Sequence, residues 1–509
     1  MTSENVDNER VPFEVAIDRT GFGLYSYILT ALTGLVIISF ACIVFSSTII
    51  VPSSACELET TGVQQGLLAS APIIGTIIGA ILWGYLADTR GRRSMLLVSL
   101  LGGTIINAIA SLSVNWIMLL ILQFIASLSS SGQYTISMTI LSESVPMAKR
   151  NIVLLLVTSI FLLAQGIMAA LAMPVIPLSF SYYLSGLGIY WNSWRTLMLV
   201  YCIPSLICAV WLMFMQESPK YTLAKGDEEE TLRILRSIHR MNNRNSNKQL
   251  QVNGLEKESS QEKTSVKKKI APLFKRPLVK YTAIMATLSI FHQITAFGVW
   301  LPTIANKYVS LLQTGEGSDL TLCGIYNADI DIPEDPDAVP CALDTTALTI
   351  VLSVGALQSV VNLLISVVVI YTGRRNTVMA IAGFCGICGI LINMVPNAIV
   401  SLVLFGIYLM AMMLLGLYTA ISVALFPTNL RALAVSLTMT GGRIGSFASI
   451  QILNFLLVNN CEVGFYVYAS IFTLSAVVAS FLPNDRLVTQ QHLKQLNEEI
   501  ESKNDNKNL

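Results

Sequence analysis

Charged and polar side chains inside long apolar runs are the first candidates for chemistry in this sequence. Arg443 lies well inside the apolar run 432–458, counting ~1.5 Å of helix per residue from its start. An arginine within a membrane costs several kcal/mol unless it faces a water-filled cavity or a partner. We therefore interpret Arg443 as a candidate substrate-binding residue. The alternative is a structural arginine that binds backbone carbonyls near Gly441, Gly442 and Gly445.

Uncharged polar and aromatic side chains in other apolar runs are further candidates for binding. His292, beside Gln293, could hold a proton or donate a hydrogen bond to a solute. A lone histidine in a helix is more often satisfied by a neighbouring side chain. Trp300 could line a cavity or face lipid. Gln133 and Tyr134 follow a run of small residues, so close helix packing explains them at least as well as binding does.

A charged stretch between two apolar runs is the second kind of site, and it reads Gly84-Tyr-Leu-Ala-Asp-Thr-Arg-Gly-Arg-Arg93. A short basic turn between two membrane-length helices is typical of a cytoplasmic loop. Asp88 adds a carboxylate, which can lie at the N-terminus of another helix, where the macrodipole stabilises it by ~0.3–1 kcal/mol. The alternative is that Asp88 and the arginines only orient the loop.

The composition indicates which elements must position these residues. Hydrophobic residues make up 53% of the chain and charged residues 12%, whereas soluble domains carry about 25% charged residues. Apolar runs near the ~20 residues that cross a bilayer recur along the chain, and helices satisfy their own backbone groups in lipid. Cys385 and Cys388 lie in an apolar run, so we interpret them as core residues. With no zinc spacing, phosphate loop or nucleophile elbow, we expect neither an enzyme nor a metal or cofactor.

The runs divide the chain into two similar halves of six helices. We predict a polar N-terminal tail (1–20), a first bundle (21–215), a charged central loop (216–278), a second bundle (279–483) with a long acidic loop (305–345), and a polar C-terminal tail (484–509). Within the central loop, 227–241 has its apolar residues on one face, which predicts an amphipathic helix.

The charges of the loops predict the orientation. Basic residues follow the second, fourth, sixth, eighth and tenth runs, and the acidic loops, with Glu57, Glu59 and Asp329 to Asp344, lie on the other side. The positive-inside rule therefore places both termini in the cytoplasm. Gly91-Arg92-Arg93 after the second run is repeated as Gly373-Arg374-Arg375 after the eighth. Parallel six-helix repeats are one transporter architecture, in which the substrate is held near the midplane between the halves.

Cysteines near the outer ends of the runs predict a disulfide. Cys323 and Cys341 flank the outer acidic loop, a setting in which disulfides persist. A Cys323–Cys341 bond is the simplest pairing. Cys56 and Cys461 also lie near outer helix ends, so other pairings remain open.

Several motifs carry a family resemblance. Gly84 to Arg93 resembles the loop signature of the major facilitator superfamily and matches it throughout. Further stretches that resemble superfamily motifs are Glu143-Ser-Val-Pro146 with Arg150, Glu217-Ser-Pro-Lys220, and Phe426-Pro-Thr-Asn-Leu-Arg431. Within the superfamily the chain is most similar to the synaptic vesicle glycoprotein 2 group, a relative of the organic ion transporters. The stretches that point there are Val51-Pro-Ser53, Cys56-Glu-Leu58, Trp194-Arg195 and the acidic outer loop.

The resemblance implies an all-α membrane protein with a twelve-helix major facilitator fold, built as two six-helix bundles in a pseudo-twofold arrangement. It implies that Asp88 lies at the start of the eleventh helix and that Arg92 completes a latch between the bundles in the outward-facing state. In organic ion transporters the position of Arg443 bears on substrate charge, so an arginine favours an anion or zwitterion. The other residues to which the motifs give a gating role are Gly84, Gly91, Glu143, Arg150, Glu217, Arg374 and Arg431.

These features predict a secondary transporter that moves a small organic solute by alternating access, with an organic anion or zwitterion favoured. Apart from end positions such as Glu143, no carboxylate lies within a predicted span, so facilitated diffusion or anion exchange fits better than proton coupling, unless His292 carries the proton. The alternative is a transporter-like receptor or vesicle-trafficking protein that no longer cycles. We expect a monomer in the plasma membrane or an endomembrane vesicle, in contact with lipid and a solute and not with nucleic acid.

Overall fold

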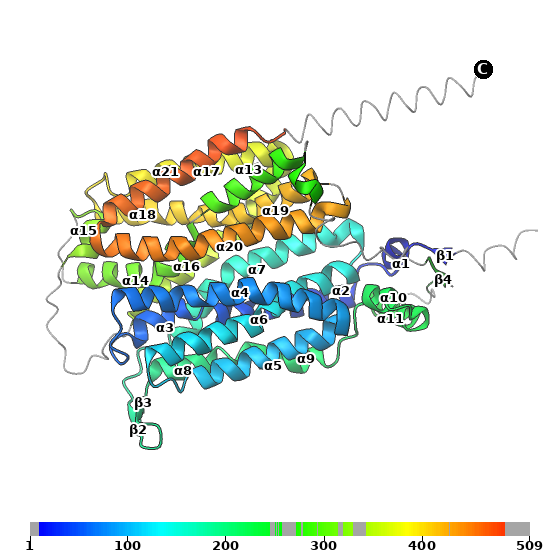
Figure 1. The fold of residues 1–509 in the computed structure, drawn as a ribbon, viewed down its shortest axis with the longest axis horizontal. Coiled ribbons are helices and arrows are strands. Elements are labelled where there is room, and N and C mark those ends of the chain that lie inside the picture. The colour runs from blue at the N-terminus through cyan, green and yellow to red at the C-terminus, as the bar shows by residue number, and fades with distance from the viewer. Residues whose placement is uncertain are drawn as a thin grey trace, which may run out of the picture.

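The structure is a computed structural model of the 509-residue chain. It describes residues 10–244, 250, 252, 254–256, 271–275, 278–292, 294–313, 319–328, 343–426 and 428–483. Long helices run side by side in two halves, with the N-terminal half in blue to cyan and the C-terminal half in green to red (Figure 1). The predicted all-α architecture of two six-helix bundles is confirmed.

The N-terminal half holds six membrane-length segments. In chain order they are α2 (Leu24–Val44) with α3 (Ser47–Ser54), α4 (Gly62–Arg90), α5 (Arg92–Ala110), α6 (Trp116–Ser144), α7 (Met147–Ala172), and α8 (Ser193–Val200) with α9 (Ile203–Leu212). Between α7 and α8 lies a hairpin of β2 (Tyr182–Leu184) and β3 (Ile189–Trp191).

The C-terminal half repeats this order. Its segments are α13 (Leu278–Phe291) with α14 (Ile294–Gln313), α16 (Thr345–Thr372), α17 (Arg374–Leu391), α18 (Ala398–Leu409) with η2 (Met410–Met413) and α19 (Leu414–Leu425), α20 (Thr428–Asn459) and α21 (Cys461–Ser480). Across the described residues, eleven segments are long and apolar enough to span a bilayer. The twelfth, α17, has a less apolar sequence because it begins with two arginines and an asparagine.

Matching caps in the two halves explain where corresponding helices begin and end. Gly91 ends α4 at φ +104°, and Gly373 ends α16 at φ +81°, a region that glycine adopts without a Cβ penalty. Asn115 caps α6 by accepting the Met118 N–H at 2.8 Å, and Asn397 caps α18 in the same way. The residues that repeat in the sequence therefore cap corresponding helices in the two halves.

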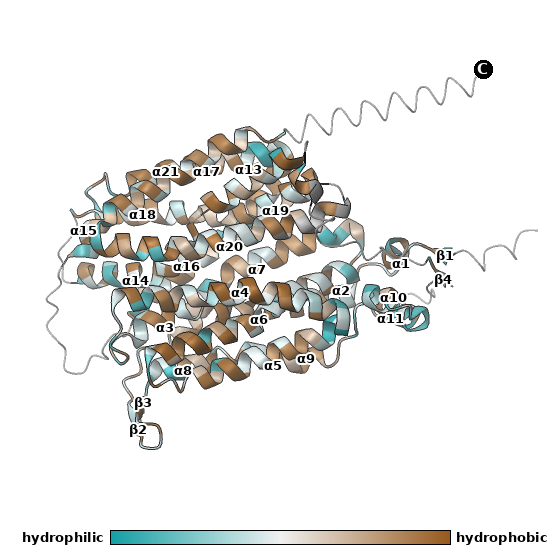
Figure 2. Cartoon of the chain, viewed as in Figure 1, coloured by the Kyte–Doolittle hydropathy of each residue, from teal (hydrophilic) through white to brown (hydrophobic). Residues whose placement is uncertain are grey.

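Two ends of the molecule are distinguished by the small elements that cover them. The α11 end carries α1 (Phe13–Arg19), α10 (Pro219–Ala224) and α11 (Glu228–Asn242), and the α15 end carries α15 (Leu322–Asn327) and the β2–β3 hairpin (Figure 1). Hydrophobic residues dominate the helices between these ends, whereas α10 and α11 are largely hydrophilic (Figure 2). The remaining short elements are β1 (Arg10–Val11), β4 (Gly254–Leu255) and η1 (Ala271–Phe274).

The predicted amphipathic helix of the central loop is α11, and it packs against a segment expected to be a polar tail. Leu232 and Leu235 of α11 form a small core with Ala16 and Ile17 of α1. Val11 of β1, which pairs in parallel with β4, joins the same core. The N-terminal segment and the central loop therefore fold together against the N-terminal half.

The two halves meet along α4 with α20 and along α7 with α16, toward the α15 end. From α20, Gln451 Nε2 donates to Gly66 O at 2.7 Å, and Asn454 Nδ2 donates to the carbonyl of the first residue of α4 at 2.6 Å. A Cβ placed on Gly355 of α16 would lie 2.9 Å from the amide nitrogen of Gly166 of α7. These close approaches join the halves near the α15 end.

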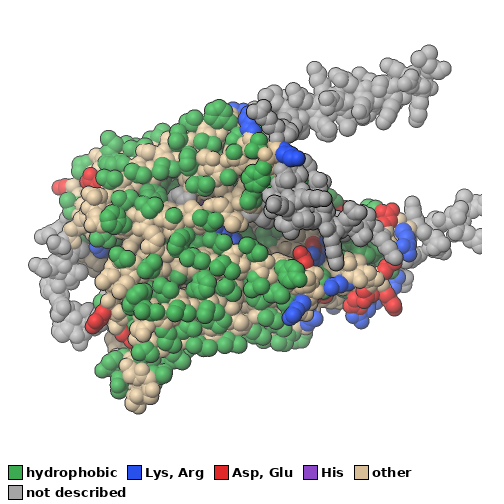
Figure 3. Space-filling model, in the orientation of Figure 1, with side chains coloured by type: hydrophobic (Ala, Val, Ile, Leu, Met, Phe, Trp, Pro, Cys, Tyr) green, Lys and Arg blue, Asp and Glu red, His purple; other side chains and the backbone are tan. Residues whose placement is uncertain are grey.

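Toward the α11 end, the same face of α4 is uncovered. Gly84 lies about five turns from Gly66 and so on the same side of the helix. Among the described residues, no atom lies within 4 Å of a Cβ placed on Gly84, and the neighbouring Ile81 and Tyr85 are 72% and 70% exposed. Figure 3 shows the surface hollowed between the halves on this side. The space between the halves therefore opens toward the α11 end.

Candidate functional site

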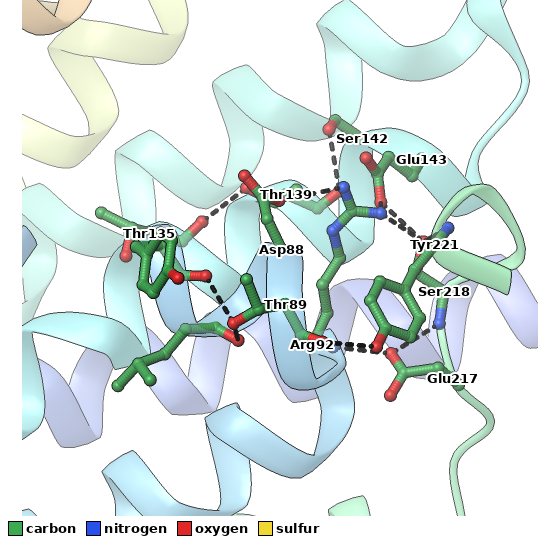
Figure 4. A network of polar contacts seen from close by, with 12 residues as sticks. Asp88, Thr89, Arg92, Thr135, Thr139, Ser142, Glu143, Glu217, Ser218 and Tyr221 are labelled. Atoms are coloured by element: carbon green, nitrogen blue, oxygen red, sulfur yellow. Dashed lines mark hydrogen bonds and ion pairs between the residues drawn. The ribbon is translucent and has the colours of Figure 1, made fainter. Parts of the chain in front are cut away.

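Arg92 organises a polar network at the α11 end of the N-terminal half (Figure 4). Its side chain is 12% exposed, and its Nη1 lies 2.5 Å from Glu143 Oε2 and donates to Ser218 Oγ at 3.1 Å. Ser218 in turn donates to Glu143 Oε2 at 2.6 Å. One guanidinium therefore joins the start of α5, the end of α6 and the segment that enters α10.

Glu217 supports this network through the backbone. One carboxylate oxygen accepts the N–H groups of Arg92 at 3.0 Å and Arg93 at 2.8 Å, at the N-terminus of α5, where the helix dipole favours a negative charge. Gly91 is needed for this approach, because a Cβ there would lie 2.8 Å from the other Glu217 oxygen. Arg93 extends the contact by donating to the carbonyls that end α9.

Asp88 stands at the edge of the network, and the structure does not bring it to α20. Its side chain is 73% exposed, and its ion pair is with Arg92 at 3.5 Å, one turn away. Gly84 lies open on the same helix. The side chain of Arg431, which the resemblance gives a gating role at the start of α20, lies outside the described residues. Asp88 therefore pairs only within its own bundle among the described residues, and the latch between the bundles stays a prediction.

The two other predicted gating arginines lie outside the Arg92 network. Arg150 pairs with Glu14 of α1 at 2.9 Å and so ties α7 to the N-terminal segment. Arg374, the counterpart of Arg92 in the C-terminal half, donates to Ala420 O at 3.2 Å. The position that corresponds to Asp88 is Ile370, so the second half has no carboxylate at the equivalent point.

Arg443 lies where the two halves face each other. From α20 its Nη1 donates to Thr76 O of α4 at 3.4 Å, a long hydrogen bond. Tyr134 of α6 lies within electrostatic range of the guanidinium and packs between Phe40 and Phe161, with ring centroids 5.6 and 5.7 Å away. Among the described residues no carboxylate pairs with Arg443. Arg443 therefore contacts the N-terminal half through α4, and Tyr134 of α6 is an electrostatic neighbour of it.

Gln133 is placed differently from its neighbour. It is fully buried, its Oε1 accepts from Ser39 Oγ at 3.1 Å, and its Nε2 donates to Ser99 O at 3.4 Å. These bonds hold α2, α5 and α6 together inside the N-terminal half. The packing explanation given for Gln133 in the sequence fits this geometry better than direct binding.

His292 lies at the break between α13 and α14, inside the C-terminal half. It is 3% exposed, and its ring lies 5.6 Å from that of Tyr418. Trp300 of α14 is also buried. Within the described part of the chain, neither ring nitrogen of His292 nor Nε1 of Trp300 has a hydrogen-bond partner. Gln293 lies outside the described residues. The break itself adjoins α20, because Thr295 and Ser446 share a hydrogen bond of 3.1 Å close to Arg443.

The predicted Cys323–Cys341 disulfide is wrong. Cys323 of α15 is bonded to Cys461, the first residue of α21, with their Cα atoms 5.6 Å apart. The cause is the position of α15, whose Cys323 N–H donates to Asn393 Oδ1 at 3.0 Å and so sits over the helix ends of the C-terminal half. Cys56 is also disulfide-bonded, and Cys341 lies outside the described residues.

A buried ion pair at the α15 end was not among the predicted binding or gating residues. Arg195 is fully buried, lies 2.6 Å from Glu57, and donates to the carbonyls of Ser111 and Ser113. Glu57 also accepts from the Trp194 indole at 2.7 Å. In the sequence Glu57 contributes to the loop charges and, with Trp194-Arg195, to the family resemblance, but nothing there pairs it with Arg195. A charge at the end of an apolar run nevertheless needs a partner when it is buried.

Comparison with known proteins places the fold in a family. The family model described as "Major Facilitator Superfamily" matches residues 32–450. Synaptic vesicle glycoprotein 2B of Mus musculus is 28% identical over 46% of this chain and 34% of its own length. Synaptic vesicle glycoprotein 2A of Homo sapiens is 26% identical over 46% and 31% respectively. The alignments thus span about a third of these curated relatives.

A solved structure has the same fold. The xylose transporter XylE from E. coli, in a partially occluded inward open conformation, superposes with a TM-score of 0.64 over 91% of this chain and 98% of its own, at 17% identity. Among the described residues, no group of three or more His, Cys, Asp or Glu is placed to hold a metal. The match to the family model and the twelve-helix architecture agree: this chain belongs to the Major Facilitator Superfamily.

Proposed function

We propose that this protein is a secondary transporter that moves a small organic anion or zwitterion by alternating access. The observation that carries the proposal is Arg443, a cation between the two halves and within a membrane span. Placing an arginine there costs several kcal/mol unless water or a partner compensates. Its bond to Thr76 O is long, and no described carboxylate neutralises it, so its charge is available to an anionic solute.

Tyr134 is the second residue that we assign to the solute. Its hydroxyl can donate or accept a hydrogen bond, and its ring is fixed by Phe40 and Phe161. It comes from the N-terminal half, whereas Arg443 comes from the C-terminal half. A solute bound by both would therefore respond to any movement of one half against the other.

The distribution of charge favours a cytoplasmic α11 end. Arg90, Arg92, Arg93 and Arg150 lie at the helix ends there, and Glu57, Glu59, Asp344 and Glu462 lie at the α15 end. By the positive-inside rule the α11 end faces the cytoplasm. The conformation described above, closed near α15 and open near α11, is then the inward-facing state.

Return to the outward-facing state requires the uncovered face of α4 to close on α20. Asp88 would then approach the N-terminus of α20, where the helix dipole stabilises a carboxylate by ~0.3–1 kcal/mol or more when partly buried. The Arg92–Glu143 pair and the bonds of Glu217 keep the α4–α5 turn rigid. In this proposal the α4–α5 turn moves as a rigid unit with the N-terminal half when α4 closes on α20.

The direct test is uptake into proteoliposomes. A panel of organic anions, cations and neutral solutes would be offered with and without a pH gradient, to wild type, Arg443→Gln and the charge-preserving control Arg443→Lys. We expect anion uptake in wild type, loss of at least tenfold in Arg443→Gln and partial retention in Arg443→Lys. Unchanged anion kinetics in Arg443→Gln would remove the assignment of this residue.

The second candidate function rests on the relatives. The aligned proteins are named as synaptic vesicle glycoproteins. A vesicle-trafficking or receptor role would predict no counterflow for any solute in the panel, together with a tight protein partner recovered from native membranes. Counterflow of any one organic anion would support transport and exclude a role limited to trafficking or reception.

A further inference from the structure

The segment between α7 and α8 is a hairpin that projects sideways from the α15 end of the N-terminal half (Figure 1). Its strands β2 and β3 pair antiparallel, with Tyr183 opposite Tyr190. Residues 173–192 contain no Lys, Arg, Asp, Glu or His. The hairpin therefore differs from the acidic loops at the same end of the molecule.

Neither face of this hairpin is polar. Alternate residues of a strand point to opposite faces. The rings of Tyr183 and Tyr190 lie 5.1 Å apart on one face and are 60% and 53% exposed. On the other face Tyr182 is 67% and Leu184 38% exposed, and Leu187 in the turn is 47% exposed. A hairpin meant for water keeps one face polar, and an isolated two-stranded hairpin is only marginally stable in water.

The base of the hairpin is fixed to the helices. Ile189 is buried, and Trp191 Nε1 donates to Thr196 Oγ1 at 3.0 Å. Asn192, the next residue, donates to the Glu57 carboxylate that also pairs with the buried Arg195. The direction in which the hairpin projects is therefore set by the ion pair at its base.

That direction places the hairpin at the edge of the membrane. It leaves from the end of α7 at Ala172 and returns at the start of α8 at Ser193, and it points across the helix axes rather than along them (Figure 1). The spanning segment that it joins exposes Leu199 and Ile203. Figure 3 shows hydrophobic side chains over much of the surface of the helices and some on the projection at the lower left.

We propose that residues 180–191 form an interfacial anchor that lies on the bilayer, with the tyrosines and Trp191 at the level of the lipid headgroups. Tyrosine and tryptophan are enriched there because one part of each ring is apolar and another forms hydrogen bonds. An exposed apolar surface of this kind needs a cover, and the lipid that already covers the adjoining helices is continuous with it. The anchor fixes the depth of the N-terminal half in whichever leaflet the α15 end faces, and it does not depend on the proposed substrate.

Spin labelling tests the depth of the hairpin directly. The full chain would be reconstituted in nanodiscs with a nitroxide on Ser185→Cys in the exposed turn, and collision rates with oxygen and with a water-soluble nickel chelate would be measured. Glu229→Cys on α11 is the aqueous control, and Ile207→Cys, at a position 50% exposed on α9, is the lipid control. The unsubstituted chain gives the labelling background.

We expect nickel collisions at Ser185→Cys to be several-fold fewer than at Glu229→Cys, with oxygen collisions between those of the two controls. Adding Tyr183→Asp and Tyr190→Asp should restore nickel access while a label at Ile207→Cys is unchanged. Nickel access equal to that of Glu229→Cys in the unmodified hairpin would overturn the proposal. Spin–spin broadening that disappears on dilution with unlabelled protein would also overturn it, because a second copy would then cover the hairpin.

Discussion

Replacing Glu57 with alanine would leave Arg195 fully buried without its carboxylate partner. Glu57 receives three donors, from Arg195 at 2.6 Å, Trp194 at 2.7 Å and Asn192 at 2.5 Å. Removing one partner of a buried ion pair costs ~3–5 kcal/mol. The Glu57 side chain is 22% exposed, and Arg195 keeps two carbonyl acceptors, so we expect the lower end, about 3 kcal/mol of unfolding free energy.

The glutamine variant refines this expectation. Glu57→Gln keeps a carbonyl oxygen for one or two of the donors and loses the charge. We therefore expect a loss of unfolding free energy of about 1.5–2 kcal/mol, at the lower end of what a hydrogen bond to a charged group contributes. Glu59→Gln is the matched control, because Glu59 is an exposed acid two residues away. Its stability should stay within ~0.5 kcal/mol of wild type.

The midpoints of thermal unfolding of the three variants can be compared in detergent by fluorescence-detection size-exclusion chromatography. A loss of 3 kcal/mol should lower the midpoint by several degrees, at roughly 2–4 °C per kcal/mol for a unit the size of one half. The expected order of midpoints is Glu59→Gln, then Glu57→Gln, then Glu57→Ala. A Glu57→Ala midpoint equal to that of Glu59→Gln would refute the reasoning, because the ion pair would then carry no stability.

Three further predictions concern turns, disulfides and gating. Gly91→Ala should destabilise by about 1–3 kcal/mol, since it places a side chain at positive φ beside a carboxylate. Gly84→Ala, inside α4 with room for its Cβ among the described residues, should keep or slightly raise the same thermal midpoint. Non-reducing peptide mapping should recover a Cys323–Cys461 peptide pair, and a free thiol at either residue would contradict the fold of α15. Asp88→Asn should insert and fold normally yet slow solute exchange at least several-fold; wild-type exchange rates would reduce the motif to a topology signal.

Much of the fold could be predicted from the sequence because its signals are local. The apolar runs give the spans, and the repeated Gly91 and Gly373 give helix ends that the structure repeats in both halves. The face of apolar residues in 227–241 predicts α11 to within a residue or two. Each of these signals depends on a few neighbouring residues and on the bilayer thickness.

What could not be predicted depends on contacts between distant segments. The disulfide partner of Cys323 was wrong because α15 folds over α21, which loop spacing does not reveal. The N-terminal segment forms α1 only because α11 supplies an apolar face for it. The break of the helix at His292 was also not predicted, since the apolar run continues on both sides of it.

The candidate site was predicted in part for the same reason. Arg443 stands out in any apolar run, but its contact with Thr76 O of α4 depends on how the two halves pack. Gln133 and Tyr134 are adjacent in sequence, yet Gln133 bonds to α2 and α5, whereas Tyr134 packs on Phe40 and Phe161 and interacts electrostatically with Arg443. A helix places successive residues on different sides, and only the packing decides which side becomes a binding surface.

We propose that Arg443 gives this protein a preference for anions, and competition for uptake measures that preference. A labelled organic anion taken up by wild-type proteoliposomes would be competed with unlabelled anions and cations, and the series repeated with Arg443→Gln and Arg443→Lys. We expect inhibition by anions and not by cations in wild type and in Arg443→Lys, and loss of uptake in Arg443→Gln. Equal inhibition by cations and anions in wild type, or full anion uptake by Arg443→Gln, would contradict it.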